Sequence, residues 1–226
     1  MASKLTLLGE GAEAKIYLLE VFNTKLIVKH RISKPYRHPL FDKLFRERRT
    51  KTEARVLSKL YSSNLPVPAP LFVDPFNSII VMEYVPGKKL SDVIYRLNKD
   101  VVGSIAYRLG EYVGKMHCLN IYHGDLTLAN ILYSENIDRI FLIDFGLAGY
   151  STDIEEYAID IHLIERSINA LAPELSKSFV ESFWQGYMEG YGENAHEIKN
   201  RVHEIKLRGR YVEERLKKRL EHERYR

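Results

Sequence analysis

Three polar side chains in one short stretch have the types and spacing that phosphoryl transfer from ATP requires. Asp125 ends the segment His-Gly-Asp, Asn130 follows five residues later, and Asp144 opens the segment Asp-Phe-Gly. A carboxylate such as Asp125 can accept the proton of an attacking hydroxyl, and carboxylate and amide oxygens can hold Mg²⁺ between phosphates. The pattern predicts Asp125 as a catalytic residue and Asn130 and Asp144 as metal ligands.

The residues between Asn130 and Asp144 predict a β-hairpin that brings these two side chains together. Apolar runs at 131–133 and 140–143 flank the turn residues Ser-Glu-Asn at 134–136. Short apolar runs separated by turn residues are typical of antiparallel strands. The beginning of the first strand and the end of the second strand then lie at the same end of the hairpin.

A small-residue loop near the N-terminus has the composition of a phosphate-binding loop. The sequence Gly-Glu-Gly-Ala-Glu-Ala occupies residues 9–14, between two strand-like runs. A P-loop or a Rossmann turn needs a helix after the loop, so the flanking strands exclude both. Small residues let backbone N–H groups approach phosphates, which makes Gly9, Gly11 and Ala14 candidate nucleotide-binding residues.

A lysine and a glutamate are predicted to form an ion pair. Lys29 lies in an apolar strand-like run at 25–32, where an unpaired charge is costly. Residues 40–61 have helical periodicity, and Glu53 lies on the apolar face of that helix, whereas Glu47 has polar neighbours. We expect Lys29 to contact phosphates and Glu53 to hold its amine. The alternative is that Lys29 lies on an exposed face of the strand.

A hinge and an adenine pocket are expected after a strand at 78–82. Residues 83–87 end this strand and close with Pro-Gly. The backbone groups of Glu83 and Val85 are expected to meet the edge of the adenine ring, and Met82 to line the pocket behind it. Core packing is an equally good reason for a methionine at this position.

The second half of the chain is predicted to be mostly helical. The single cysteine, Cys118, is expected to be a buried thiol and indicates a reducing environment. Both a buried and an exposed Asp160 fit the pattern of its helix. Because a helix follows the Asp-Phe-Gly segment closely, no long activation segment is expected. The helical periodicity covers residues 91–97, 105–119, 153–171, 173–192 and 194–206.

The charge distribution points to anionic partners. The chain has 226 residues and a net charge of +4, but residues 29–55 hold ten Lys and Arg against three Asp and Glu. Residues 201–226 hold ten against five, although ion pairs within a solvated helix would explain the tail equally well. No signal peptide and no apolar run near the ~20 residues of a membrane span are present. We expect a cytoplasmic protein with no membrane partner.

Taken in order, the small-residue loop, the strand lysine, the helix glutamate, the hinge and the two acidic motifs resemble a protein kinase. More narrowly, the chain resembles the PRPK family, the small atypical serine kinases of the KEOPS complex. This resemblance extends over nearly the whole chain, and the stretch from the lysine to Tyr-Arg-His-Pro is its most specific part. The residues that carry it are 9–14, 28–31, 34–39, 52–55, 123–127, 144–147 and 207–210.

The resemblance implies an α+β, bilobal protein-kinase-like fold. A small antiparallel sheet and one long helix form the N-lobe, and the C-lobe is reduced, mostly helical and without a long activation segment. The corresponding ranges are 1–83 for the N-lobe, 84–87 for the hinge, 88–206 for the C-lobe and 207–226 for a basic tail. Family tails usually end soon after position 210, so no role is assigned to the extension 211–226.

The resemblance also implies ATP and Mg²⁺ as cofactors, with weak serine/threonine phosphorylation and ATPase activity. The expected partners are the other KEOPS subunits, chiefly the threonylcarbamoyl-transfer subunit, in a complex that makes threonylcarbamoyladenosine in tRNA. The tRNA is expected to contact the basic tail and residues 29–55. Thr127 stands where ordinary protein kinases carry lysine. Without an activation segment, regulation through a partner that moves the helix bearing Glu53 is favoured.

Two other functions stay open. A small-molecule phosphotransferase of the aminoglycoside or choline kind has the same acidic motifs, but the 82 residues after Asp144 leave little room for a substrate cavity. A non-catalytic, kinase-shaped RNA-binding scaffold is the other alternative. The intact set of Lys29, Glu53, Asp125, Asn130 and Asp144 argues against it.

Overall fold

The computed structural model describes residues 4–11 and 13–208, and the chain forms two compact units. Unit 1 contains the N-terminal part of the chain and a later segment that returns to it, so its residues are not contiguous in sequence. The lobe boundaries expected from the sequence stay a prediction. Unit 1 is Met1–Leu97 with His123–Tyr150, and unit 2 is Asn98–Tyr122 with Ser151–Arg226.

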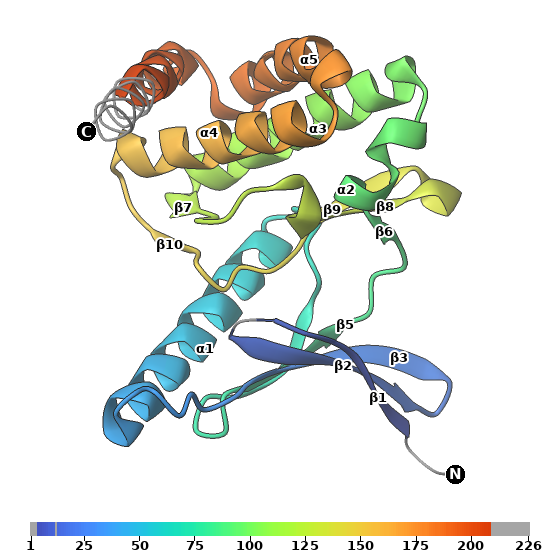
Figure 1. The fold of residues 1–226 in the computed structure, drawn as a ribbon, viewed down its shortest axis with the longest axis vertical. Helices are drawn as coiled ribbons and strands as arrows, with labels where there is room; N and C mark the ends of the chain where they lie inside the picture. Colours follow the sequence, from blue (N-terminus) through green and yellow to red (C-terminus); the bar gives the residue numbers. More distant parts are fainter. Residues whose placement is uncertain (1–3, 12, 209–226) are drawn as a thin grey trace, which may run out of the picture. The chain divides into compact units, whose positions relative to one another are not determined.

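Unit 1 is built on a five-stranded antiparallel sheet with the strand order β1-β2-β3-β5-β4 (Figure 1). Phe22 and Asn23 connect β2 to β3 with positive φ angles of 48° and 63°, as tight two-residue hairpin turns require. The central strand β3 carries Lys29. The strands are β1 (Lys4–Glu10), β2 (Ala14–Val21), β3 (Thr24–Arg31), β4 (Pro70–Asp74) and β5 (Ile79–Glu83).

A long helix, α1 (Pro39–Ser62), accompanies this sheet and confirms the helix predicted at 40–61. Pro39 stands at the start of α1, where its missing N–H costs no helical hydrogen bond. The side chains of Val56, Leu57 and Leu60 are buried, one to four residues apart along the helix. Glu53 is buried on the same side, as the apolar periodicity predicted.

A small three-stranded sheet is ordered β6-β8-β9. Asn130 directly precedes β8, and Asp144 lies two residues after β9. The predicted hairpin is confirmed, since β8 and β9 are antiparallel neighbours. The Ile143 N–H donates to the Asn130 carbonyl at 3.0 Å, which holds Asn130 close to the residue before Asp144. The strands are β6 (Lys88–Lys89), β8 (Ile131–Ser134) and β9 (Arg139–Leu142), and β10 (Gly149–Tyr150) lies at the end of unit 1.

The prediction of a single helix at 91–97 is wrong. The chain forms a short helix, α2 (Leu90–Val93), followed by a 3₁₀ helix, η1 (Ile94–Arg96). Val93 has a φ of −125°, outside the helical range, and the β-branched pair Val-Ile resists helix continuation. Two further 3₁₀ turns are η2 (Leu128–Asn130) and η3 (Glu135–Ile137).

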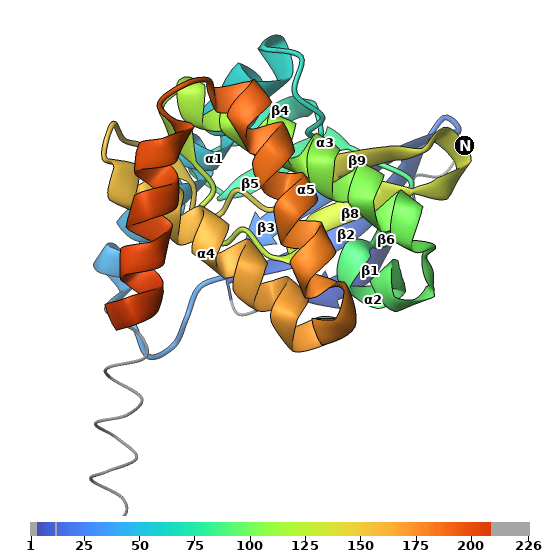
Figure 2. The same ribbon diagram turned by 90° about the horizontal axis from the view of Figure 1, so that it is seen from above.

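Unit 2 is mostly helical (Figures 1 and 2). Asn98 caps the first helix, α3, by accepting the Asp100 N–H at 3.0 Å, so α3 begins six residues before the predicted start at 105. None of the described helices is both long and apolar enough to cross a membrane. The elements are α3 (Lys99–Cys118), β7 (Ile121–Tyr122), α4 (Ile154–Leu171), α5 (Pro173–Tyr191) and a helical stretch at 195–208.

Two polar side chains of unit 2 settle expectations from the sequence. Asp160 is buried in α4, with its Oδ2 3.3 Å from Nε2 of His117, and the Nδ1 of His117 lies 3.0 Å from the Tyr187 hydroxyl. The expectation of a buried Cys118 is wrong. Cys118 is exposed at the last position of α3, where its thiol lies 3.5 Å from the Tyr191 carbonyl.

Helices α3 and α5 pack against each other at very close range, and glycines make this possible (Figure 2). A Cβ atom added to Gly186 would overlap the carbonyl oxygen of Tyr107, and one added to Gly110 would overlap that of Phe183. Real Cβ atoms do not approach backbone oxygens so closely. Glycine is therefore required at this crossing of the two helix backbones.

Gly186→Ala is expected to destabilise the protein by about 1–3 kcal/mol, because the new methyl group pushes the backbones of α3 and α5 apart. Gly103→Ala in α3 is the matched control, since its Cβ would meet only the Ser182 hydroxyl at 3.6 Å. Alanine there should be neutral or stabilise α3 by up to about 1 kcal/mol. Urea unfolding of both variants measures the difference, and equal losses at both positions would contradict this packing.

Candidate active site

The strand lysine lies at the centre of a buried ion cluster in unit 1. The Nζ atom of Lys29 is 2.7 Å from Oε1 of Glu53 and 2.6 Å from Oδ1 of Asp144. Lys29 is 6% exposed and Glu53 is 1% exposed, so the alternative of a lysine on an exposed face is wrong. The Asp144 side chain is half exposed. The structure thus brings three of the predicted site residues into direct contact.

Glu53 has a second cationic partner that the sequence reasoning missed. The guanidinium of Arg31 donates to Oε2 of Glu53 and, at 3.4 Å, to the hydroxyl of Thr50. Arg31 is two residues after Lys29 on β3, and alternate residues of a strand share a face. That spacing was the available signal. Two cations therefore compensate the carboxylates of Glu53 and Asp144.

The neighbouring charges keep Lys29 and Asp144 ionised. Burial alone would lower the pKa of Lys29, but the Glu53 and Asp144 carboxylates outweigh it and raise this pKa above 10.5. Burial alone would raise the pKa of Asp144. The Lys29 ammonium outweighs that effect, with help from the Gly146 N–H at 3.3 Å, and lowers the pKa of Asp144 below 3.8. Both groups are charged at neutral pH.

The segment His-Gly-Asp is held in a turn that only glycine permits. Gly124 has a φ of 79°, and a Cβ there would overlap the carbonyl oxygen of Leu147. The buried ring of His123 has its Nε2 3.1 Å from the Ile143 carbonyl, and its Nδ1 lies 3.3 Å from the Asp125 N–H. His123 therefore ties the loop carrying Asp125 to the residue that follows β9.

Asn130 and Asp125 are in direct contact. The Nδ2 atom of Asn130 donates to the Asp125 carboxylate at 2.9 Å and to the Asp125 carbonyl at 2.8 Å. The Oδ1 atom of Asn130 is thus the atom that can bind a metal. Asp144 has a φ of 61°, a conformation that is uncommon for aspartate and concentrated at functional sites.

The donor set fits a magnesium ion that arrives with phosphates. Asp144 and Asn130 offer one carboxylate and one amide oxygen, and Mg²⁺ completes such sites with water and phosphate oxygens. Across residues 4–11 and 13–208, no group of three or more His, Cys, Asp or Glu side chains could hold a metal by itself. A metal ion at Asp144 and Asn130 would therefore need further ligands from water or a bound anion.

Two adjoining cavities of unit 1 meet at Lys29 and Asp144. The first has a volume of about 410 Å³ and mostly apolar walls. The predicted adenine-side residues Met82, Glu83 and Val85 all line it. A planar, apolar ring with polar edges suits such a cavity. The apolar wall, which the sequence reasoning named only in part, includes Leu8, Ile16, Ile27, Leu57, Leu132 and Ile143.

About half of the residues that line the second cavity, of about 590 Å³, are charged, and we call it the polar cavity. Its walls include the predicted phosphate-loop residues Gly9, Gly11 and Ala14, and the Gly11 N–H donates to the Ala14 carbonyl at 2.9 Å. Ala12 of the same loop lies outside the described residues. The charged residues of its lining are the cations Lys29, Arg31 and Lys89 and the carboxylates Glu10, Glu13, Asp125 and Asp144. This composition suits an anionic group with a metal ion.

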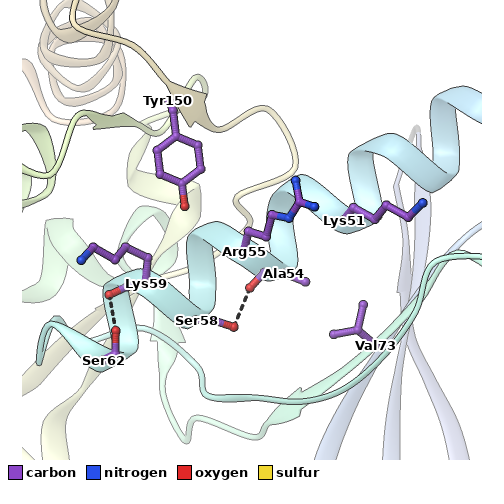
Figure 3. Close-up of a pocket in the computed structure, with 8 residues that line it drawn as sticks. All are labelled: Lys51, Ala54, Arg55, Ser58, Lys59, Ser62, Val73 and Tyr150. Atoms are coloured by element: carbon purple, nitrogen blue, oxygen red, sulfur yellow. Dashed lines mark hydrogen bonds between the residues drawn. The ribbon is translucent and has the colours of Figure 1, made fainter.

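A third pocket, of about 810 Å³ and wide open to solvent, runs along α1 and shares no residue with the other two. Figure 3 shows its cationic side chains Lys51, Arg55 and Lys59, which project from α1 near Tyr150 and Val73. Two serines in its lining donate their hydroxyls to carbonyls of the helix itself. No acidic residue is among those that line it. We call this surface the α1 groove.

The fold and the site together define a protein kinase domain. The family model described as "Protein kinase domain" matches residues 2–178 of the chain. Only nine residues separate Asp144 from the beginning of α4, so the long activation segment of larger kinases is absent, as predicted.

Comparison with known proteins narrows this class. The KEOPS complex subunit Bud32 of Pyrococcus abyssi is 38% identical over 216 residues, covering 92% of this chain and 97% of that protein. The EKC/KEOPS complex subunit bud32 of Dictyostelium discoideum is 33% identical, covering 90% of this chain and 82% of that protein. The chain belongs to the Bud32 family of kinase-like proteins, as the resemblance predicted.

A longer relative contains a similar domain as one part. The probable bifunctional tRNA threonylcarbamoyladenosine biosynthesis protein of Methanobrevibacter smithii is 33% identical over 206 residues. The match covers 91% of this chain but only 37% of that protein. A kinase-like domain of this kind is thus joined to a further polypeptide segment in that relative.

Asp144 is expected to make the stability of the protein depend on pH in acid. Its folded pKa lies below the ordinary 3.8, so ionised Asp144 stabilises the fold above about pH 4 and loses this effect as the pH falls through the folded pKa. The difference in unfolding free energy between the wild type and Asp144→Asn should be constant near neutrality and shrink below about pH 4. Urea titrations at several pH values measure it, and a constant difference down to about pH 2.5 would contradict the shift.

Proposed function

We propose that the chain binds ATP with Mg²⁺ in the two adjoining cavities and transfers the γ-phosphoryl group to a serine or threonine hydroxyl or to water. The observation that carries this proposal is the Lys29 ammonium, held between Glu53 and Asp144 where the apolar and polar cavities meet. Membership in the protein kinase class supports it, because protein kinases use ATP with a divalent metal.

The residues that line the cavities support a proposed position for each part of the nucleotide. The adenine ring is proposed to lie in the apolar cavity, with Met82 behind it and the backbone of Glu83 and Val85 at its edge. The phosphates are proposed to lie in the polar cavity beneath Gly9, Gly11 and Ala14, which present backbone rather than side chain. We propose the ranges 1–83, 84–87, 88–206 and 207–226 as N-lobe, hinge, C-lobe and tail.

The residues of the site are then proposed to have distinct roles. Lys29 holds the phosphates, and Glu53 keeps the Lys29 amine in place. Asp144 and Asn130 hold Mg²⁺, which when bound neutralises charge on the phosphates. Asp125 orients the attacking hydroxyl and accepts its proton, and its contact with Asn130 fixes its distance from the metal site. Positioning and charge neutralisation supply most of the catalysis.

We also propose that the chain acts as a subunit of a KEOPS complex, chiefly beside the threonylcarbamoyl-transfer subunit, and supports threonylcarbamoyladenosine modification of tRNA. The names of the relatives support this proposal. So does the longer relative named as bifunctional, in which a similar domain is only one part of the protein. The α1 groove supports tRNA contact within residues 29–55, because it presents Lys51 and Arg55 from that range, with Lys59 just beyond it, and no carboxylate. The basic tail beyond residue 208 lies outside the described residues, and a cytoplasmic location stays a prediction.

Asp144→Ala is expected to reduce ATP turnover by roughly 10²-fold or more, because the removed carboxylate is the proposed charged ligand of the metal. The fold should persist, since Asp144 is half exposed and Glu53 keeps both cations. Asp92→Ala, which removes an exposed carboxylate from α2, is the matched control. Release of labelled phosphate from [γ-³²P]ATP with Mg²⁺ gives the rates, and circular dichroism checks the fold. Turnover near that of the wild type would refute the assignment of Asp144.

The same assay separates the proposed function from a small-molecule phosphotransferase. Aminoglycosides and choline are added as acceptors beside a serine-containing protein acceptor. We expect transfer to protein or to water and none to the small molecules. Efficient transfer to one of them, lost in Asp144→Ala, would favour the alternative.

Purification of the tagged chain from its native lysate is expected to recover the threonylcarbamoyl-transfer subunit in stoichiometric amount, identified by mass spectrometry. The reason is that relatives of this chain are named as subunits of the KEOPS or EKC/KEOPS complex. A tagged chain that has been unfolded and blocked is the control for adhesion to the resin. Recovery of the intact chain without this partner would speak against the proposed complex.

A further inference from the structure

The guanidinium of Arg31 makes this cluster different from a simple lysine–glutamate pair. Arg31 donates to Oε2 of Glu53, while Lys29 lies 2.7 Å from the other oxygen, Oε1. The two cations therefore occupy separate oxygens of one carboxylate. We propose that Arg31 is a positioning residue that keeps Glu53 neutralised, so that Lys29 can exchange Asp144 for the phosphates of a nucleotide. The inference rests on the proposed function for its nucleotide step.

The count of charges shows why a second cation is needed. In the described cluster, Lys29 and Arg31 balance Glu53 and Asp144. If Asp144 turns to a metal ion, the Lys29 ammonium is shared between Glu53 and the phosphates. Glu53 is only 1% exposed, and a buried carboxylate that loses part of its compensation is costly. Arg31 supplies a positive charge that stays behind.

Contacts within unit 1 fix Arg31 in place. Its backbone N–H donates to the Ser78 carbonyl at 3.0 Å, and its own carbonyl accepts from Arg46 at 3.4 Å. The Thr50 hydroxyl donates to the Arg46 carbonyl at 2.8 Å, so its oxygen is turned to accept from the guanidinium. A Cβ at Gly146 would already lie 3.4 Å from a terminal nitrogen of Arg31. These contacts hold both the backbone and the guanidinium of Arg31 beside Glu53.

The remaining nitrogen of the guanidinium supports a role for its charge. The Nε atom of Arg31 is buried and has no hydrogen-bond partner within residues 4–11 and 13–208. A buried donor without a partner costs stability. Hydrogen bonding alone therefore explains this arginine poorly, because one of its buried donors is unused. A fixed positive charge beside Glu53, in contrast, neutralises that carboxylate both before and after a nucleotide binds.

The same contacts bear on regulation. In this structure α1 already carries Glu53 in contact with Lys29, and Arg31 and Thr50 hold that arrangement from within unit 1. Many kinases form the equivalent pair only after activation. In this structure the pair is thus already formed.

A stability experiment without nucleotide tests the hold of Arg31 on Glu53. Lys29→Met alone should lower the thermal midpoint by only about 2–4 °C, since Arg31 still neutralises Glu53. In the Arg31→Met background, Lys29→Met should lower the thermal midpoint by roughly twice as much or more, because Glu53 is then buried without a cation. Arg48→Met, which removes an exposed arginine of α1, is the matched background and should leave the Lys29→Met effect unchanged.

Adding Glu53→Gln to the double variant removes the uncompensated charge and should recover most of the loss. If the double variant does not fold, this triple variant decides: folding of the triple variant supports the proposal, and failure overturns it. Additive effects of Lys29→Met and Arg31→Met overturn it as well.

Nucleotide kinetics test the second half of the proposal. Arg31→Met should raise KM for ATP with Mg²⁺ by roughly tenfold and change kcat less than about threefold. Without Arg31, Lys29 stays with Glu53, and its contact with the phosphates is weakened to the same extent in the ground state and in the transition state. Arg31→Lys keeps the charge and should stay within about threefold of the wild-type KM, although lysine lacks the planar fork. Arg48→Met should match the wild type.

A wild-type KM in Arg31→Met, or a loss confined to kcat, overturns the positioning role. A wild-type protein that binds no ATP with Mg²⁺ would overturn the proposed function instead. The stability experiment would still decide whether Arg31 holds Glu53, so the two failures are distinguishable.

Discussion

The burial of the Glu53 carboxylate is the constraint on which the rest of unit 1 depends. A carboxylate in the protein interior is tolerated only when cations and hydrogen bonds replace its lost hydration. Lys29 and Arg31 supply the cations from alternate positions of one strand, and α1 supplies the carboxylate. The sheet and the helix are thereby fixed to each other at one point, and Lys29 is aimed at Asp144.

Backbone conformation and backbone hydrogen bonds help to position the acidic motifs. The hairpin of β8 and β9 brings Asn130 and Asp144 to one end, and a backbone hydrogen bond from Ile143 to Asn130 sets their separation. The left-handed conformations of Gly124 and Asp144 turn the chain sharply at both motifs. Strained backbone at these points is a cost that the surrounding structure bears, as is common at functional sites.

Family membership and geometry contribute different things to the functional argument. The comparisons show the class and the Bud32 family, and they say nothing about individual side chains. The geometry shows which side chains meet and which cavities they line, and it does so with residues of unit 1 alone. The proposal of ATP-dependent phosphoryl transfer depends on their agreement around Lys29. The scaffold alternative would have to explain why a charged cluster suited to a metal–nucleotide pair is retained intact.

By itself, the sequence determined the long helix α1, the hairpin, the pairing of Lys29 with Glu53 and some of the residues around the two adjoining cavities. These follow from local periodicity and from motif spacing, which are properties of neighbouring residues. Only the tertiary structure decided that Arg31 is a second partner of Glu53, that Asp160 is buried and that Cys118 is exposed. Whether a polar side chain is buried depends on what packs against it from distant parts of the chain, and no local pattern contains that information.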